Sequence, residues 1–309
     1  METRHLSAFP TYRSAGYQPP PLHVIKAAVN AMRAGQFDGT EHEDLLLPAA
    51  VQVAAATEPR GSARPSPPDL GAPAVLVLAG HAGAGASTVA LALAEALSGR
   101  WRVQLVEYSE PRRSGLGAAS PRELGVDAAG WRRGRRGALD LARLSSIREL
   151  GECFPPPLPL AQPPDHHKAG DRLLVLDLGW AATSTMGEAS WVTTLLGSAE
   201  LVVVTRLTVP GVRQTEQLLS SLPVPAVLAL VGSGRWSGEV AASCGPAIRA
   251  GRDSGRAVMI PTDRRLEISG LTADPLPRSV AAAGRALAAR LSPERLTPPG
   301  MPLPRPKEF

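Results

Sequence analysis

The sequence has little lysine, few aromatic residues and only two cysteines. Lysine occurs only at Lys26, Lys168 and Lys307, so arginine carries nearly all of the positive charge. Cys153 and Cys244 lie far apart and form no CxxC pair. This spacing excludes a disulfide framework and an ordinary zinc site, and it suits a reducing cytoplasm. We expect both cysteines simply to pack.

The sequence also lacks long apolar runs. A membrane-spanning helix needs roughly 20 consecutive apolar residues, and no run approaches that length. The first 21 residues lack the apolar core of a secretory signal. We therefore expect a cytoplasmic protein without direct membrane insertion. A hydrophobic content of 44% excludes a chain that is disordered throughout, whereas the net charge of +5 does not by itself identify a partner.

The composition changes twice along the chain. Residues 1–73 are polar or rich in proline, with an amphipathic pattern over 22–35 and a second helix pattern interrupted by Pro48. We interpret residues 1–73 as a partly disordered extension with one or two short helices and a proline-rich linker over 57–73. The helices either pack on the main domain or form a separate docking element. Residues 293–309 are a proline-rich tail.

Between these ends, residues 74–292 alternate short apolar runs with helical stretches. The runs are apolar on both faces, which is typical of central parallel strands covered by helices. The alternation predicts an α/β domain with a doubly wound, mostly parallel sheet flanked by helices. The expected strands are 74–79, 103–107, 173–178, 201–205, 226–231 and 257–260, and the expected helices are 87–98, part of 138–150, 184–197, 209–221, 238–250 and 278–291.

The stretch GHAGAGAST, residues 80–88, joins the first expected strand to the first expected helix. A phosphate-binding loop needs small residues, inward-pointing N–H groups and the positive start of a helix, and this stretch provides them. It also needs a lysine that reaches the phosphates, but that position is Ala86. The alternative is a tight turn without a ligand. The candidate nucleotide contacts are Gly80, Gly83, Ala84, Gly85, Ala86, Ser87 and Thr88.

With these features, residues 74–292 resemble the MinD/ParA family of P-loop ATPases, in particular a divergent actinobacterial branch related to septum-site-determining and CpaE/TadZ-like pilus-assembly proteins. The family loop has the form KGGxGK[ST]. Against it, His81 and Ala86 replace the two lysines and Ser87 keeps the hydroxyl position, which gives a degenerate Walker A motif. In the family, the first lysine reaches the partner's nucleotide across a dimer and the second binds phosphate within its own subunit.

Further family markers follow in order. Glu107 keeps a carboxylate in the segment EYSEP. The resemblance implies that Asp177, at the end of the third expected strand, assists magnesium together with Ser87. It also implies that Pro261 and Asp263 of IPTDRRL lie beside the nucleotide base. A simpler role for Glu107 and Asp177 is to cap turns at strand ends.

The residues needed for ATP hydrolysis are incomplete. Ser109 stands where the family has its water-positioning aspartate, and Ala86 replaces the phosphate-binding lysine. Loss of one preorganised donor typically lowers a rate by a factor on the order of 10²–10³. We expect ATP and magnesium to bind weakly or not at all, and we favour a pseudo-ATPase that acts on a protein partner or as a homodimer. A slow ATP-dependent switch is the alternative.

The run WRRGRR, residues 131–136, is the densest basic cluster. It raises a third hypothesis, a DNA-associating accessory protein that holds phosphate backbones without reading base sequence. The alternative is a solvated arginine-rich loop. His166 and His167 lack a third metal ligand, so we expect them to be exposed. The candidate DNA contacts are Arg132, Arg133, Arg135 and Arg136.

Overall fold

A computed structural model of the chain describes residues 72–109, 111–127, 130–145, 172–180, 192 and 195–297. The chain divides into two compact units, Met1–Gly61 and Ser62–Phe309, and every described residue belongs to the second. The helix predicted over 22–35, most of the linker, His166, His167 and most of the helix predicted over 184–197 lie outside the described residues.

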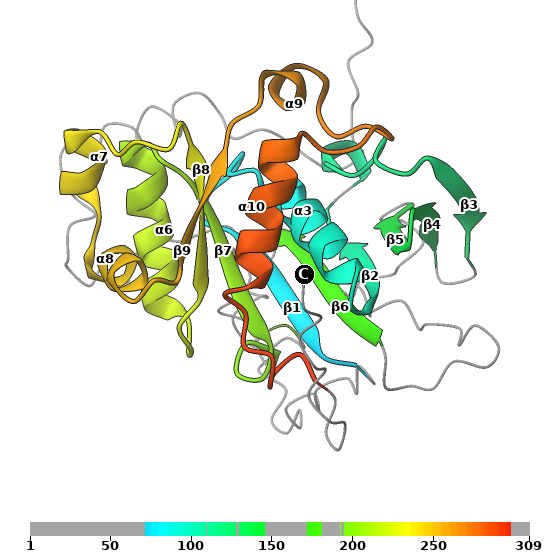
Figure 1. The fold of residues 1–309 in the computed structure, drawn as a ribbon, viewed down its shortest axis with the longest axis horizontal. Coiled ribbons are helices and arrows are strands. Elements are labelled where there is room, and N and C mark those ends of the chain that lie inside the picture. The colour runs from blue at the N-terminus through cyan, green and yellow to red at the C-terminus, as the bar shows by residue number, and fades with distance from the viewer. Residues whose placement is uncertain are drawn as a thin grey trace, which may run out of the picture. The chain divides into compact units, whose positions relative to one another are not determined.

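Nine described strands form a single sheet (Figure 1). They are β1 (Ala74–Ala79), β2 (Arg102–Glu107), β3 (Arg122–Val126), β4 (Trp131–Arg136), β5 (Leu139–Leu144), β6 (Arg172–Gly179), β7 (Glu200–Arg206), β8 (Val227–Gly232) and β9 (Ala257–Pro261). Their order is β3-β4-β5-β2-β6-β1-β7-β8-β9. The seven strands from β5 to β9 in this order are parallel, whereas β3 and β4 are antiparallel to their neighbours. β1 lies between β6 and β7, and the chain connections lead from it toward both sides of the sheet. In open α/β sheets, ligands bind at the carboxyl end of the strands at such a point, which is where the loop after β1 lies.

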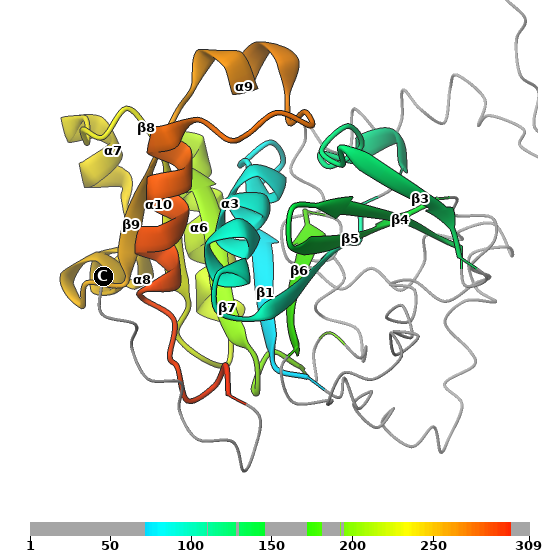
Figure 2. The same cartoon turned by 45° about the vertical axis from the view of Figure 1, so that its right-hand side comes forward.

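Helices cover both faces of this sheet. The described helices are α3 (Ala86–Ser98), α6 (Val209–Ser221), α7 (Gly238–Ser243), α8 (Pro246–Asp253), α9 (Arg264–Ser269) and α10 (Arg278–Ala288), with a 3₁₀ turn, η1 (Pro111–Arg113). Figure 2 shows α3 and α10 side by side on one face, with α6 behind the sheet. Val75 and Val77 of β1 join the core under α3, while Leu76 and Leu78 join the core on the α6 face. This alternation explains why the central strands are apolar on both sides.

The structure confirms the predicted fold class and the six predicted strands, with small shifts at their ends. The helix predicted over 209–221 is α6 with the same bounds. The prediction over 238–250 is wrong in one respect, since Cys244 and Gly245 separate two helices there, and Pro246 begins the second. A proline has no N–H to continue the first helix.

Two predictions for the segment that precedes Ser145 are wrong. Residues 139–144 form β5 and not a helix, and residues 131–136 form β4 and not a loop. The two strands form an antiparallel hairpin in which Arg136 pairs with Leu139 around a two-residue turn. The strand β5 pairs in parallel with β2 at the edge of the predicted sheet, and β4 and β3 follow it, so three strands extend the sheet beyond the six that were predicted.

Arginine side chains attach this hairpin to the domain. Arg136 is buried, and its guanidinium forms an ion pair with Glu95 of α3 and donates to the Ala119 carbonyl. Arg143 is also buried, and it donates two hydrogen bonds of 2.6 and 2.7 Å to Glu123. Both arginines belong to the described interior, where these hydrogen bonds and ion pairs offset the cost of burying a guanidinium, although Nε of Arg143 has no hydrogen-bond partner among the described residues.

We expect Gly284→Ala in α10 to lower the melting temperature. A Cβ at Gly284 would overlap the backbone of Ala92 in α3, so the two helices would have to separate. Such overpacking typically destabilises by about 1–3 kcal/mol, more than the roughly 1 kcal/mol that alanine gains over glycine in a helix. Thermal unfolding followed by circular dichroism measures the change.

The matched control is Gly238→Ala in α7, because no atom lies within 4 Å of the position of its Cβ. Its melting temperature should stay the same or rise. If both variants melted at the same temperature, close α3–α10 contact at Gly284 would be contradicted.

Candidate functional site

Two glycines give the loop after β1 its backbone shape. Gly83 and Gly85 have φ angles of 73° and 95°, in the left-handed region that other residues rarely adopt. Gly85 directly precedes α3, and the N–H of Gly80 donates to the Val204 carbonyl of β7 at 2.8 Å. The first N–H groups of any helix have no partner within the helix, and here they follow a glycine-rich loop. The backbone therefore has the form that binds an anion.

A hydrogen bond to the side chain of His81 connects the loop to the end of β7. The backbone N–H of Arg206 donates to Nε2 of His81 at 3.1 Å, and Nδ1 lies 2.8 Å from the Ala82 carbonyl oxygen. An N–H group can only donate, so Nε2 accepts and Nδ1 carries the proton. In this arrangement His81 is a neutral ring that positions the loop. It does not supply a positive charge to the loop.

Ala86 is the first residue of α3, and its methyl group packs into the core together with Ala84 and Val89. Only 7% of Ala86 is exposed. Residues 80–88 contain no lysine or arginine. The loop thus presents backbone dipoles and hydroxyl groups, and none of its own side chains presents a permanent positive charge.

Two carboxyl groups lie at the ends of neighbouring strands beside the loop. Glu107 of β2 and Asp177 of β6 are direct partners in the parallel register, and both are fully buried. Burial raises the pKa of Glu107 to about 7, with a further increase from the charge of Asp177. Burial also raises the pKa of Asp177 to about 6, against hydrogen bonds from Ser87 and from the Gly179 N–H. The pair therefore retains protons into the neutral range.

The segment Ser114–Leu116 folds over this acidic pair. The Ser114 hydroxyl donates to Oε2 of Glu107 at 2.5 Å, and the N–H groups of Gly115 and Leu116 donate to Oε1 at 2.7 and 3.2 Å. A Cβ at Gly115 would lie 2.6 Å from Oγ of Ser87, so glycine is needed for this close approach. Glu107 thus caps a turn, which was the simpler role considered from the sequence. The contact of this segment with Glu107 could not be predicted from the sequence, because the short stretch SGL forms no recognisable motif.

Asp177 has the environment of a cation ligand. Its Oδ2 is buried and has no hydrogen-bond partner among the described residues, while Ser87 hydrogen bonds to the same carboxyl group. An unpaired buried carboxylate oxygen next to a hydroxyl group fits Mg²⁺, which prefers oxygen ligands. The described ranges, this site included, contain no group of three or more His, Cys, Asp or Glu residues that could hold a metal ion.

The remaining predicted nucleotide contacts lie at the ends of other strands. Pro261 ends β9 and pairs in register with Gly232 of β8. The Asp263 carboxylate accepts hydrogen bonds from two backbone N–H groups at the start of α9, at 2.9 and 3.2 Å. Asp263 therefore caps a helix, and its predicted contact with a base stays a prediction. Ser109 lies against Gly179, next to the acidic pair.

The four candidate DNA-contacting arginines do not share one exposed surface. Arg132 and Arg135 are exposed, Arg133 forms an ion pair of 2.6 Å with Asp127, and Arg136 is buried. Because Arg136 has its donors committed inside the domain, it is not free to hold a phosphate backbone. DNA contact by the exposed arginines stays a prediction.

Two expectations about packing are confirmed for described residues, whereas Cys153 lies outside the described residues. Cys244 is buried, and its thiol lies 3.2 Å from the Val240 carbonyl oxygen within α7. The helix predicted near the C-terminus is α10, which packs on α3 and β9.

Within the described part of the chain, no helix combines the length and the apolar character needed to cross a membrane.

Comparison with known proteins gives similarity to solved structures alone, since no family model and no curated protein matches the chain. A ParA family ATPase from Chlorobium tepidum is 17% identical, with 70% of this chain and 98% of that chain covered and a TM-score of 0.46. The septum site-determining protein MinD from Pyrococcus horikoshii, solved with Mg-ADP, is 17% identical, with 70% and 94% covered and a TM-score of 0.47. MinD from Aquifex aeolicus is 15% identical, with 76% and 100% covered and a TM-score of 0.43. We draw no functional conclusion from similarity at this level.

We expect the free energy of unfolding to fall as the pH rises from about 5 to about 8. Glu107 and Asp177 have raised pKa values in the folded state, so the folded protein binds more protons than the unfolded chain across this window. Their contribution is complete below the unfolded pKa values near 4 and is lost as the pH passes the folded values near 6 and 7. The expected change is on the order of 2 kcal/mol, measured by urea unfolding at each pH.

Asp177→Asn is the matched variant, because it keeps the size of the side chain and removes one of the two titrations. Its unfolding free energy should vary less with pH than that of the unmodified protein. An identical pH dependence in both proteins would show that the acidic pair does not ionise in this range.

Proposed function

We propose that the chain is a MinD/ParA-like pseudo-ATPase of the divergent actinobacterial branch, which regulates or scaffolds a protein partner in septum placement, DNA partition or transfer, or the positioning of an apparatus. The observation that carries the proposal is Ala86. The loop keeps its left-handed glycines and the start of α3, but at the position of the phosphate-binding lysine it has a buried methyl group.

The absence of a positively charged side chain from the loop argues against efficient hydrolysis of ATP. Phosphoryl transfer depends on positioning and on neutralising the negative charge of the transferred group. Backbone N–H groups and the helix start attract a phosphate, but they carry only partial charges. The one titratable side chain of the loop, His81, uses Nε2 to accept a hydrogen bond from Arg206. Hydrolysis through this loop therefore lacks its main source of positive charge.

The residues that would hold magnesium are retained. Ser87 and Asp177 would be its protein ligands, directly or through water, and Oδ2 of Asp177 is the oxygen that has no other described partner. When bound, magnesium would neutralise charge on the phosphate oxygens. Proximity of Gly115 to Ser87 means that an ion at Ser87 would displace the segment Ser114–Leu116. Release of this segment would change the surface that the chain presents. In this way a weakly bound ligand would affect a partner protein, or a second copy of the chain in a homodimer.

The proposal predicts that millimolar Mg-ATP or Mg-ADP changes the melting temperature no more than magnesium alone does. Ala86→Lys should restore a shift with Mg-ATP, because a ligand that binds only the folded state stabilises it by RT ln(1 + [L]/Kd). Thermal unfolding with and without each nucleotide measures both.

The control is Ala82→Lys, which adds the same charge at an exposed position of the same loop. It should not restore the shift. A large Mg-ATP shift in the unmodified protein, abolished by Asp177→Asn, would contradict the pseudo-ATPase and favour the slow ATP-dependent switch.

A further inference from the structure

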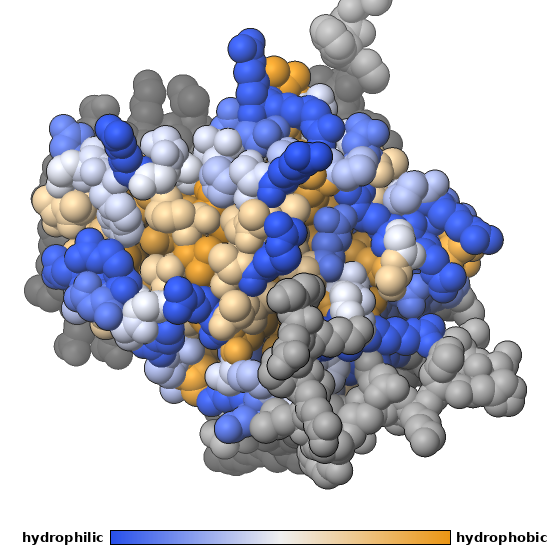
Figure 3. Space-filling model, in the orientation of Figure 1, coloured by the Kyte–Doolittle hydropathy of each residue, from blue (hydrophilic) through white to orange (hydrophobic). Residues whose placement is uncertain are grey.

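The β4–β5 end of the sheet carries a basic pocket that the proposed function does not use. The pocket has a volume of about 350 Å³ and is lined by Arg102, Arg135, Gly137, Ala138 and Asp140. Its size lies within the range of small-molecule sites. Figure 3 shows that the visible surface over β3, β4 and β5 is mainly hydrophilic.

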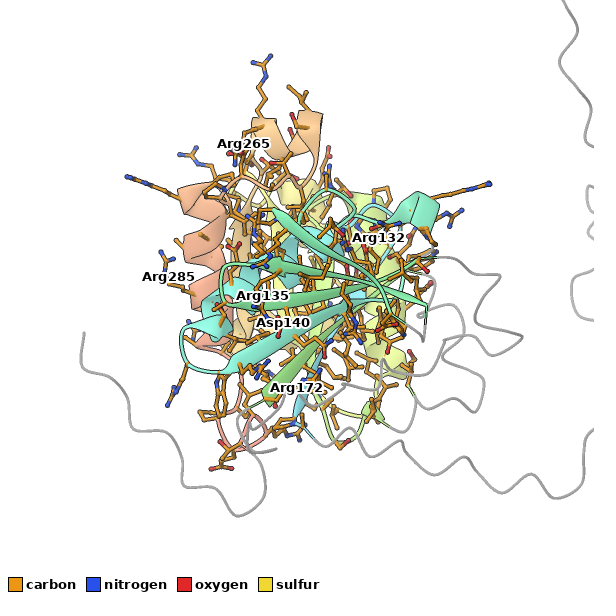
Figure 4. All side chains as sticks on the ribbon, turned by 90° about the vertical axis from the view of Figure 1, so that its right-hand side faces the viewer. Arg132, Arg135, Asp140, Arg172, Arg265 and Arg285 are labelled. Carbon is orange, nitrogen blue, oxygen red and sulfur yellow. The ribbon has the colours of Figure 1, made fainter. Side chains whose placement is uncertain are left out.

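The side chains of the pocket come from adjacent strands. Arg135 of β4 is the register partner of Asp140 of β5, and Arg102 of β2 is the register partner of Arg172 of β6. Asp140 in turn lies beside Gln104 of β2 in the register of β5. Figure 4 shows Arg135, Asp140 and Arg172 one below another on the side that faces the viewer. Three guanidinium groups thus gather around a single carboxylate.

This carboxylate leaves most of the guanidinium donors unused. Nε of Arg135 lies 3.2 Å from Asp140, and a terminal nitrogen of Arg102 lies 3.7 Å from it. Neither contact is bidentate, and about half of the Arg135 side chain and a third of the Arg102 side chain are exposed. The Arg172 side chain forms no ion pair or hydrogen bond within the described part of the chain. The lining holds two arginines and one aspartate, a net charge of +1, and Arg172 beside it raises the local net charge to +2.

The local field supports this excess of positive charge. The pKa of Arg172 is lowered by burial, and it is lowered further by Arg133 and Arg102, against an opposing effect of Asp140. Arg102 and Arg133 are therefore near enough to Arg172 to add to the positive potential around it. The same arrangement gives an anion two or three charge-assisted donors.

The pocket is separate from the loop after β1. Arg102 and Arg172 begin β2 and β6, whereas Glu107 and Asp177 lie toward the opposite ends of the same strands. Glu107 lies five positions after Arg102 in β2, which is a distance of about 16 Å at a rise of about 3.3 Å per residue. A ligand in the pocket would therefore not contact the loop or the acidic pair.

We propose that this pocket binds a phosphate-bearing ligand through Arg102 and Arg135, with Arg172 adding positive charge beside them. Guanidinium groups match phosphate oxygens with two parallel N–H donors, and arginine is the residue best suited to this recognition. Asp140 forms ion pairs with both arginines and would compete with the anion for them. The phosphate belongs either to a small free diphosphate or to a phosphodiester backbone, and both present the same oxygens.

Isothermal titration of the full chain with inorganic pyrophosphate at low ionic strength tests the proposal. The double variant Arg102→Gln/Arg135→Gln should weaken binding about tenfold or more, since it removes two charge-assisted donor groups. Asp140→Asn should strengthen binding, because it frees both arginines and removes the repulsion. Opposite effects from neighbouring substitutions are not expected from general loss of structure, and circular dichroism checks the fold of each variant.

Arg285→Gln is the control for loss of a positive charge elsewhere, because Arg285 is exposed on α10, apart from the pocket in Figure 4. It should leave binding unchanged. A parallel titration with a short DNA duplex distinguishes the sources of phosphate: binding of the duplex alone, lost in the double variant and steeply salt-dependent, identifies a backbone. If neither ligand bound, if the double variant bound normally, or if Arg285→Gln lowered affinity equally, the proposal would be overturned.

Discussion

Complete burial of Glu107 and Asp177 at neighbouring strand ends is the constraint on which the rest of the site depends. Two carboxyl groups away from water must share protons, accept hydrogen bonds or meet a cation. Here the segment Ser114–Leu116 supplies the hydrogen bonds to Glu107. Arg143 in turn holds that segment, since it donates to the carbonyl oxygens of Leu116 and Gly117. The edge hairpin and the site are therefore one connected structure.

The parts of the fold with clear local signals could be predicted from the sequence. Apolar runs such as 74–79 have no face for water, so they identify central strands. The helix α6 has its helical periodicity, a Thr208 cap and a proline in its first turn. The edge hairpin could not be predicted, because β4 contains four arginines and one of them, Arg136, is buried by partners that are distant in sequence. Arg136, for example, depends on Glu95, which lies 41 positions away.

The site was predictable in its positions but not in its contacts. Spacing identifies these positions, because the loop directly follows the apolar strand β1, Ser87 lies at the start of the next helix, and Asp177 lies near the end of β6. The neutral role of His81 depends on the backbone of Arg206, a contact across 125 positions that no local pattern reveals. The cover over Glu107 likewise depends on tertiary packing. The local sequence therefore predicts which residues lie at the site, and long-range contacts decide which of their donors, acceptors and charges are available.

The central claim is that this loop has kept its shape and its acidic pair but has lost the charge that phosphoryl transfer requires. Release of inorganic phosphate from saturating Mg-ATP, compared between the unmodified protein and Asp177→Asn, tests it most directly. The account predicts equal rates, both indistinguishable from that of Mg-ATP without protein. Repeated turnover by the unmodified protein, saturable in ATP and lost in Asp177→Asn, would contradict it.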